Sequence, residues 1–258
     1  MNTTSLEGRI VMVTGGAGGI GAELVAAFAA EGALVVSVDL PSQASAGEQV
    51  AVTASAAGTG RAVFTAADIT DPDSMDAAVA AAEATFGGLD VLINNAAVYR
   101  TLSGRGPFGE VAPDEFDLVM KVNVRGTWQA ISSAVPAMRR RGGGSIVNFS
   151  STTARMGVVG FPHYVASKAA VEGLTRSAAR EFGHDRITVN AVAPGLVSDE
   201  STRIHNDQSY IDRSASTRAI QREMLPEDLF GTLRWLATPA SAFVSGQVVI
   251  VDGGQTFA

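Results

Sequence analysis

The stretch "IVMVTGGAGGIGAELVAAFAAEG", residues 10–32, decides the fold. Its middle part, "GGAGGIG" at 15–21, places five glycines in seven positions between an apolar run and an alanine-rich segment. A glycine inside a helix costs about 1 kcal/mol relative to alanine, so this cluster weakens two segments that otherwise suit a protein core. Either the chain needs only a loose turn there, or another molecule must approach the backbone closely.

The alternation of an apolar run with a helix-forming segment continues along the chain. We expect strands at 9–15, 34–40, 62–68, 90–96, 143–151, 187–195 and 247–254, and helices at 22–32, 41–60, 72–87, 113–141 and 164–183. The expected strands are short continuous apolar runs, which are typical of a parallel sheet covered on both faces. They predict an α/β fold over residues 1–258: a single doubly wound Rossmann domain with a seven-stranded parallel sheet flanked by helices on both faces.

Two segments, 97–112 and 196–225, show no clear periodicity of apolar residues. Each follows an expected strand at its carboxyl end, where open α/β sheets bind their ligands. We therefore expect them to surround a substrate, with 196–225 as the substrate-binding loop. In the long helix at 113–141, Pro136 predicts a bend.

The composition excludes several classes of protein. The chain of 258 residues is 46% hydrophobic, so it can bury a substantial core. A net charge of −7 argues against a nucleic-acid partner, because phosphates attract a basic surface. The chain has no cysteine, and its histidines, His163, His184 and His205, lie far apart in the sequence, so we expect no metal site.

The N-terminal residues "MNTTSLEGRI" contain neither a basic leader nor an apolar signal core. No apolar run reaches the roughly 20 residues that a membrane span needs. We therefore expect a cytoplasmic protein without a membrane partner.

The glycine cluster matches a phosphate-binding pattern. Thr14, Gly15, Gly19 and Gly21 form T-G-x-x-x-G-x-G between the first strand and the first helix. Glycine lets a pyrophosphate approach the backbone, and the helix N-terminus offers unpaired N–H groups with a partial positive charge. The pattern predicts a dinucleotide site, with an ordinary glycine turn as the alternative.

Asp39 ends the second expected strand, 18 residues after Gly21. A carboxylate there can accept hydrogen bonds from the adenosine ribose and would repel a 2′-phosphate. No lysine or arginine occurs between Arg9 and Arg61, which favours NAD(H) over NADP(H). Alternatively, Asp39 only begins a turn. Asp68, at the end of the third strand, could likewise reach the adenine or cap a turn.

Tyr164 and Lys168, in "YVASK", are four residues apart and therefore share one face of a helix. A free phenol titrates near 10, and a nearby ammonium favours the phenolate and lowers that pKa. The pair could exchange a proton with an alcohol or a ketone while hydride moves to or from a nicotinamide. Alone, such a pair is more often an ordinary helix surface.

The full set of motifs resembles the short-chain dehydrogenase/reductase family. The matching pieces occur in the family's order over nearly the whole chain: "TGGAGGIG", Asp39, "NNA" at 94–96, Asn123 in "KVNVRG", "GSIVNFSS", "YVASK", "APG" at 193–195 and "SGQVVIVDGG". The resemblance implies a single-domain oxidoreductase that uses NAD.

The resemblance also implies roles for individual residues. Tyr164 would be the acid/base and Lys168 its electrostatic partner. Ser151, chosen over Ser150 because it lies 13 residues before the tyrosine, would bind the substrate oxygen. Asn123 would hold a water that links Lys168 to solvent; alternatively, it satisfies a kink in its own helix.

Pattern and resemblance together assign the cofactor to a larger set of residues. These are Gly15, Gly19, Ile20, Gly21, Asp39, Asp68, Ile69, Asn95, Ala96, Tyr164, Lys168, Pro194, Gly195 and Val197. Two positions depart from the family's pattern: Ala97 replaces a glycine, which matters only if the turn needs a positive φ, and Asp199 replaces a threonine. We expect Ser198, Ser201 or Thr202 to take the role of that threonine.

The substrate is less well defined by the sequence. The candidates for its pocket are Tyr99, Thr153, Met156, His163, Ile204, Tyr210 and Met224. Four arginines of the loop either meet an anionic substrate or, as we favour, are solvated: Arg203, Arg213, Arg218 and Arg222. The loop resembles those of enzymes that oxidise aryl carbinols or other hydrophobic secondary alcohols.

Two other functions compete with an NAD-dependent alcohol dehydrogenase or ketone reductase. One is an NADPH-linked 3-oxoacyl thioester reductase, which Asp39 opposes. The other is a non-catalytic dinucleotide-binding sensor or scaffold, which would need no tyrosine acid/base. Small residues along the helices at 113–141 and 164–183 allow close helix packing, and by resemblance we expect a homotetramer.

Overall fold

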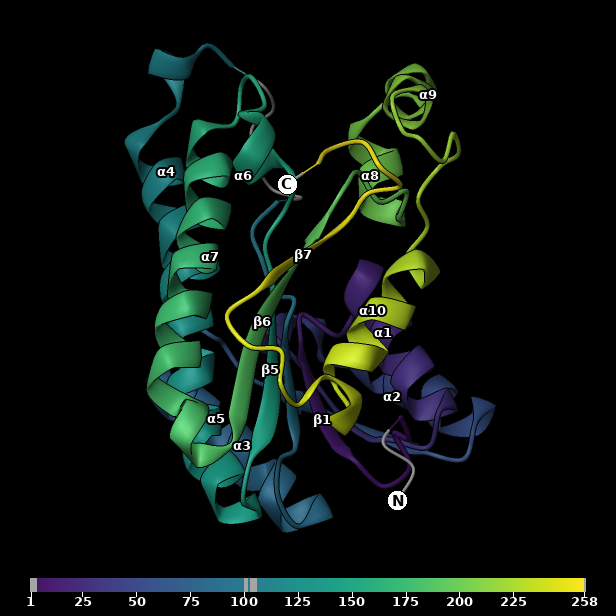
Figure 1. Ribbon diagram of the computed structural model, residues 1–258, viewed down its shortest axis with the longest axis vertical. Coiled ribbons are helices and arrows are strands. Elements are labelled where there is room, and N and C mark those ends of the chain that lie inside the picture. Colours follow the sequence, from purple (N-terminus) through teal and green to yellow (C-terminus); the bar gives the residue numbers. More distant parts are fainter. Residues whose placement is uncertain (1–3, 100–101, 103–105, 258) are drawn as a thin grey trace.

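The computed structural model describes residues 4–99, 102 and 106–257. It confirms the predicted parallel sheet of seven strands, in the order β3-β2-β1-β4-β5-β6-β7 (Figure 1). The strands are β1 (Ile10–Thr14), β2 (Leu34–Asp39), β3 (Arg61–Ala66), β4 (Val91–Asn94), β5 (Gly144–Phe149), β6 (Ile187–Pro194) and β7 (Val248–Val251). The order reverses at β1, and there Thr14 pairs with Val38 and with Asn94, so three strands end side by side.

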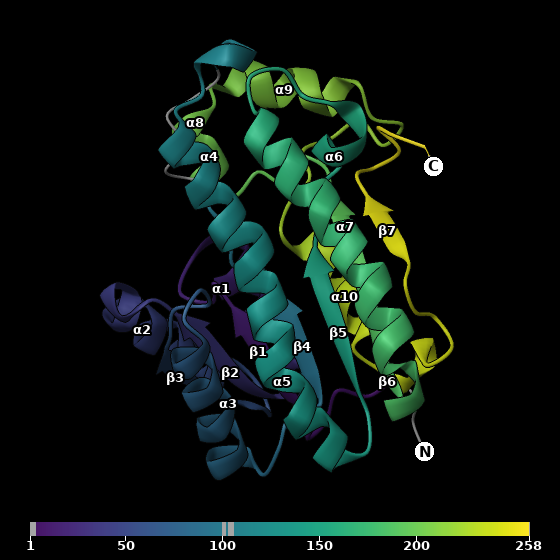
Figure 2. The ribbon, with the colours of Figure 1, turned by 90° about the vertical axis from the view of Figure 1, so that its left-hand side faces the viewer.

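Helices cover both faces of the sheet, as predicted (Figures 1 and 2). One face carries α1 (Gly19–Ala30), α2 (Ala44–Ala57) and α10 (Glu227–Leu236); the other carries α3 (Pro72–Phe86), α5 (Thr127–Arg141) and α7 (Pro162–Phe182). In β1, Val11 and Val13 enter the core of the first face, and Ile10 and Met12 enter that of the second. Burial on both sides explains why the strands are continuous apolar runs.

The segment predicted as one helix over 113–141 is interrupted. It comprises α4 (Pro113–Val119), a π-helical stretch η3 (Met120–Gly126) and α5. Pro136 lies inside α5, so the interruption falls well before the predicted bend. At η3 the Thr127 hydroxyl donates to the Asn123 carbonyl at 2.8 Å, which satisfies a backbone group within the irregular turn.

The segment 196–225 is more ordered than its composition indicates. It contains α8 (Glu200–His205) and α9 (Gln208–Ser216), each begun by an aspartate, Asp199 or Asp207, that accepts a backbone N–H. Together with α6 (Thr153–Met156), these helices stand above the carboxyl ends of the strands (Figure 1). Within the segment 97–112, residues 100–101 and 103–105 lie outside the described part of the chain.

Candidate functional site

The glycine cluster forms a turn that leaves no room for side chains. Gly15 and Gly19 have positive φ angles of 68° and 54°, a conformation that glycine adopts without strain. A Cβ atom on Gly15 would lie 2.9 Å from the Ala96 Cα, and one on Gly21 would overlap the Gly15 carbonyl oxygen. The main chain and the N-terminus of α1 thus form a bare cradle at the end of β1, which is the geometry that binds an anion.

Asp39 lies at the end of β2 and holds this cradle. Its Oδ2 accepts the Ala17 N–H at 3.0 Å, and its Oδ1 accepts the Leu40 N–H at 2.8 Å. The side chain also lines the cleft above the sheet. Asp39 therefore combines the turn-forming role with a position suited to ribose hydroxyls, because each carboxylate oxygen has a second lone pair.

Asp68 follows β3 and caps a turn. Its Oδ1 accepts the Thr70 N–H at 2.8 Å, and its own N–H donates to Ser74 at 3.0 Å. Asp68 and the neighbouring Ile69 both line the cleft, so a contact with the adenine stays a prediction.

The residues after β4 are fastened to the glycine cradle. Asn95 Nδ2 donates to the carbonyls of Thr14 and Gly15 at 3.1 and 3.2 Å, and the Ala96 N–H donates to the Thr14 hydroxyl at 3.2 Å. Ala97 is absent from the described non-glycine residues with positive φ, so its substitution for glycine introduces no backbone strain.

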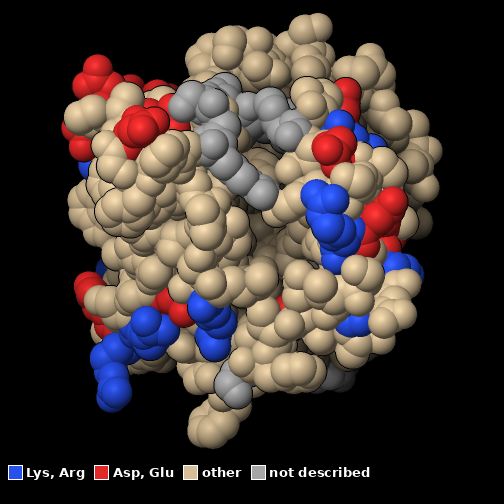
Figure 3. Space-filling view, turned by 90° about the horizontal axis from the view of Figure 1, so that it is seen from above, with Lys and Arg blue, Asp and Glu red and all other residues tan. Residues whose placement is uncertain are grey.

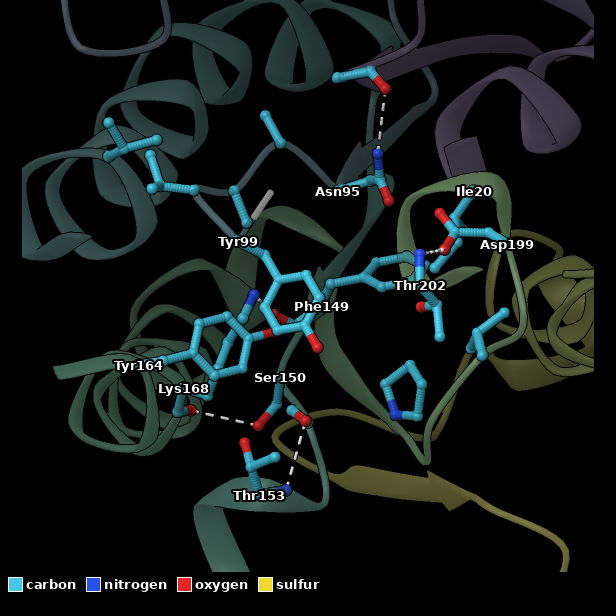
Figure 4. Close-up of a pocket in the computed structure, with 18 of the residues that line it drawn as sticks. Ile20, Asn95, Tyr99, Phe149, Ser150, Thr153, Tyr164, Lys168, Asp199 and Thr202 are labelled. Carbon is cyan, nitrogen blue, oxygen red and sulfur yellow. Dashed lines mark hydrogen bonds between the residues drawn. The ribbon is translucent and has the colours of Figure 1, made fainter. Parts of the chain in front are cut away.

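Tyr164 and Lys168 lie together at the other end of the cleft (Figure 4), which Ser151 also lines. Tyr164 lies in the first turn of α7, and Lys168 Nζ lies 5.6 Å from the centre of its ring. The Ser151 side chain hydrogen-bonds the Tyr164 phenol. Ser150 instead donates to the Lys168 carbonyl at 3.1 Å. This contact with the backbone of α7 distinguishes Ser150 from Ser151.

The electrostatics of the pair differ from the prediction. Burial raises the pKa of Tyr164, the Tyr99 phenol raises it further, and the hydrogen bond from Ser151 opposes both. Burial lowers the pKa of Lys168 to about 8, and its Nζ donates to the Phe149 carbonyl at 2.8 Å. The pKa of Tyr164 is therefore raised, contrary to the expectation that the ammonium lowers it, and desolvation of the phenol is the largest cause.

Asn123 is buried in η3 and does not line the cleft. Its Oδ1 accepts the Val98 N–H at 2.7 Å, and its Nδ2 donates to the Ser167 hydroxyl at 3.1 Å. The side chain thus joins η3, the segment after β4 and the turn of α7 that carries Lys168. The water assigned to Asn123 stays a prediction.

The cleft has a volume of about 810 Å³ and runs from Asp39 to α9. Seen from above, it is a hollow surrounded mostly by uncharged residues (Figure 3). Of the predicted cofactor residues, Gly19 and Gly21 do not line it; those that do are Gly15, Ile20, Asp39, Asp68, Ile69, Asn95, Ala96, Tyr164, Lys168, Pro194, Gly195 and Val197. Bare backbone at one end and a tyrosine–lysine pair at the other fit a nicotinamide dinucleotide.

Asp199, which replaces the threonine of the family's pattern, caps the helix α8. Its Oδ1 accepts the Thr202 N–H at 2.8 Å, and both residues line the cleft. Ser198 is buried without lining the cleft, and the Ser201 side chain is outside what the structure describes. Thr202 is therefore the candidate for the role of the missing threonine.

Four of the predicted substrate residues line the cleft: Tyr99, Thr153, Met156 and Tyr210. The other three do not: His163 is buried against Glu115 at 2.9 Å, Ile204 is exposed, and Met224 is buried beside Val197. Sequence reasoning missed Phe161, which precedes Tyr164 by three residues; that helical spacing could have indicated it. It also missed Gln255, for which no sequence signal is evident.

The prediction that the loop arginines are solvated was wrong for Arg218. Only 4% of Arg218 is exposed, and its guanidinium donates to main-chain carbonyls. Arg203, Arg213 and Arg222 are exposed, and none of the four lines the cleft.

Two searches of the described residues found nothing. Among them, no group of three or more histidines, aspartates and glutamates could hold a metal ion. None of the described helices is both long enough and apolar enough to cross a membrane.

Comparison with known proteins supports an oxidoreductase. The model of a family described as enoyl-(acyl carrier protein) reductase matches residues 15–256. A "probable galactose dehydrogenase" of Rhizobium meliloti is 38% identical, over 96% of this chain and 95% of its own length. A 3-alpha-(or 20-beta)-hydroxysteroid dehydrogenase of Mycobacterium tuberculosis is 36% identical, over 96% of this chain and 90% of its own.

The solved structures include one with the same fold. A double mutant of a Serratia marcescens short-chain dehydrogenase/reductase superposes with a TM-score of 0.87 at 36% identity. The match covers 98% of this chain and 99% of the other.

Proposed function

The chain belongs to the short-chain dehydrogenase/reductase family of oxidoreductases, and we propose that it transfers hydride between NAD(H) and a hydrophobic or aryl secondary alcohol or its ketone. One observation carries this proposal. A single cleft has the bare glycine cradle and Asp39 at one end, and Ser151, Tyr164 and Lys168 at the other.

The chain's own residues supply proton transfer. A substrate oxygen between Ser151 and Tyr164 would accept a hydrogen bond from each. In ketone reduction the Tyr164 phenol would donate its proton to the forming alkoxide, and in alcohol oxidation the Tyr164 phenolate would take the proton of the alcohol. A bound nicotinamide supplies the hydride acceptor or donor. Lys168, with a pKa of about 8, is mostly an ammonium at neutral pH and would hold the ribose and the phenol in place.

The choice of NAD(H) rests on Asp39. Its neighbours along this wall of the cleft, Val38, Leu40 and Gln43, are uncharged, so none of them would pair with a 2′-phosphate. A carboxylate at that position favours ribose hydroxyls and repels a phosphate.

The substrate class rests on the aromatic rings around Tyr164. The ring centre of Tyr99 lies 5.2 Å from that of Tyr164 and 6.3 Å from that of Phe161. These separations are typical of rings that pack together, and Met156 adds a flexible apolar edge. An apolar or aryl substituent beside the carbinol carbon suits such walls.

Two alternatives are weaker. An NADPH-linked 3-oxoacyl thioester reductase would share only an acyl-thioester substrate with the enoyl reductase that describes the family model, and it conflicts with Asp39. A non-catalytic sensor or scaffold leaves the convergence of Ser151, Tyr164 and Lys168 without a purpose.

We propose a homotetramer as the working assembly. Exposed aromatic side chains support it: Phe116 and Trp128 on the α4–α5 side, and Phe243 and Phe257 near the C-terminus.

The test is a cofactor titration followed by a substrate screen. Purified protein is titrated with NADH and with NADPH, and a panel of secondary alcohols is then oxidised while the reduced nicotinamide is followed by its absorbance. We expect tighter binding of NADH and turnover of apolar or aryl carbinols. Failure to bind either coenzyme would contradict the proposal, and tighter binding of NADPH would favour the thioester reductase.

A further inference from the structure

Arg218 is a buried arginine whose contacts are with the main chain. Arginine is almost never fully buried unless its donors are paired. Here Nη2 donates to the Leu196 carbonyl at 2.7 Å, and Nη1 donates to the Arg222 carbonyl at 2.9 Å. The side chain thus links the segment after α9 to the segment after β6.

A third segment closes around the same guanidinium. The carboxylate of Asp252, just after β7, attracts the Arg218 charge and opposes the lowering of its pKa by burial. Asp252 itself accepts the N–H groups of Gly254 and Thr256 at 2.9 and 2.8 Å. A Cβ atom on Gly253 would lie 3.3 Å from the Arg218 Cδ, so the turn packs directly on the arginine.

The backbone that Arg218 holds forms one wall of the cleft. Gly195, Leu196 and Val197 all line the cleft, whereas Arg218 does not. The other contacts of this wall come from the same side: the Gly195 N–H donates to the Val251 carbonyl at 3.0 Å, and Val197 pairs with Met224. Unlike these main-chain contacts, the hydrogen bond to the Leu196 carbonyl comes from a charged side chain, that of Arg218.

The Thr152 N–H donates to the Pro194 carbonyl at 3.0 Å, so the wall of 195–197 begins beside Ser151, at the end of the cleft where a nicotinamide would meet Tyr164. We propose that Arg218 is a positioning residue for the nicotinamide half of the cofactor site. Its guanidinium donates to the Leu196 carbonyl from the side away from the cleft and thereby fixes the backbone of 195–197 at the cleft. This proposal rests on the proposed function, and it makes a distinction within the cofactor. Removal of Arg218 should weaken contacts with the nicotinamide and leave those with the adenosine diphosphate half, some way along the cleft at Asp39 and the glycine cradle.

Two ligands separate these halves: NADH, and ADP-ribose, which lacks the nicotinamide. Arg218→Met keeps most of the apolar stem and removes the donors. For this variant we expect NADH affinity to fall roughly ten- to hundredfold, the scale of a lost charged hydrogen bond, with ADP-ribose affinity within roughly twofold of wild type. Arg218→Lys keeps one charged donor, so its NADH affinity should lie between those of Arg218→Met and the wild-type protein.

Arg222→Met is the matched control. It removes an exposed arginine of the same segment whose side chain binds the Asp228 carboxylate and the Glu223 carbonyl, outside 195–197. We expect it to bind both ligands as the wild-type protein does.

The outcomes are distinct. An equal loss of NADH and ADP-ribose affinity in Arg218→Met would show a merely structural role and overturn the proposal, as would unchanged NADH affinity. If Arg218→Met does not fold, the same comparison in Arg218→Lys decides, because a selective loss of NADH affinity supports the proposal and a parallel loss overturns it. A wild-type protein that binds neither ligand would instead contradict the proposed function, and Arg218 would have no cofactor to position.

Discussion

The two ends of the cleft are lined by different parts of the residues, main chain at one end and side chains at the other. At the Asp39 end the walls are main chain, shaped by glycines whose φ angles or close contacts admit no side chain. At the Tyr210 end the walls are side chains, contributed by α6, α7, α9 and the segments after β4 and β7. The first end is determined by local covalent geometry, and the second by the packing of segments far apart in the sequence.

This difference distinguishes the binding of a cofactor from the discrimination among substrates. A backbone cradle suits any dinucleotide with a diphosphate, whereas under the proposed function the aromatic walls would select among substrates. Tyr164 and Lys168 belong to the end lined by side chains. Each of the following changes tests one side of the comparison.

The largest effect is expected at Tyr164, at the end lined by side chains. Tyr164→Phe should lower kcat roughly 10²- to 10⁴-fold, the scale of a general acid/base, while NADH binding is kept. Steady-state kinetics and a fluorescence titration of NADH measure the two quantities. Tyr99→Phe, which removes the neighbouring phenol, should cost much less. Comparable losses in the two variants would end the assignment of Tyr164 as acid/base.

A second effect concerns stability and pH. Burial lowers the pKa of Lys168 from 10.5 to about 8, so between these values the unfolded chain binds more protons than the folded one. The free energy of unfolding should therefore gain a term on the order of 3 kcal/mol as the pH rises from about 8 to about 10.5. Urea unfolding across this range measures the slope.

Lys168→Met should abolish that contribution, and the exposed Lys121→Met should retain it. A slope that is the same in all three proteins would show that Lys168 is not buried as a cation.

Gly21→Ala tests the main-chain end. Its Cβ would overlap the Gly15 carbonyl, so the cradle must shift. We expect about 1–3 kcal/mol of lost stability and roughly a tenfold weaker affinity for NADH, measured by thermal unfolding and titration. Gly231→Ala, in a helix where a Cβ would contact nothing within 4 Å, is the control. Equal behaviour of the two variants would mean that the cradle is not tightly packed.

Asp39→Ala should produce the smallest change, a loss of roughly tenfold in the preference for NADH over NADPH. The ratio of the two dissociation constants measures it. Asp39→Asn removes the charge but keeps an acceptor for the Ala17 N–H, so it separates repulsion of phosphate from support of the loop. An unchanged ratio in both variants would show that another group reads the ribose.

The comparison also explains what could be predicted from the sequence. The glycine pattern and the continuous apolar strands are local signals, so the sheet and the place of the cradle follow from them. His163 and Arg218 were assigned to the pocket or to solvent, yet both are buried, because their partners Glu115 and Leu196 are 48 and 22 residues away. The raised pKa of Tyr164 has the same origin, since desolvation depends on every segment that closes over the ring.

The π-helical stretch at Met120–Gly126 has an evolutionary consequence. A π turn accommodates an extra residue without changing the axis of the flanking helices. Loss of one codon in this stretch would restore a regular helix and rotate α4 by about 100° relative to α5. Such a deletion would leave the hydropathy of the chain almost unchanged, yet it would withdraw Asn123 from Val98 and Ser167. The length of this helix, as well as its residue types, therefore determines where Asn123 lies.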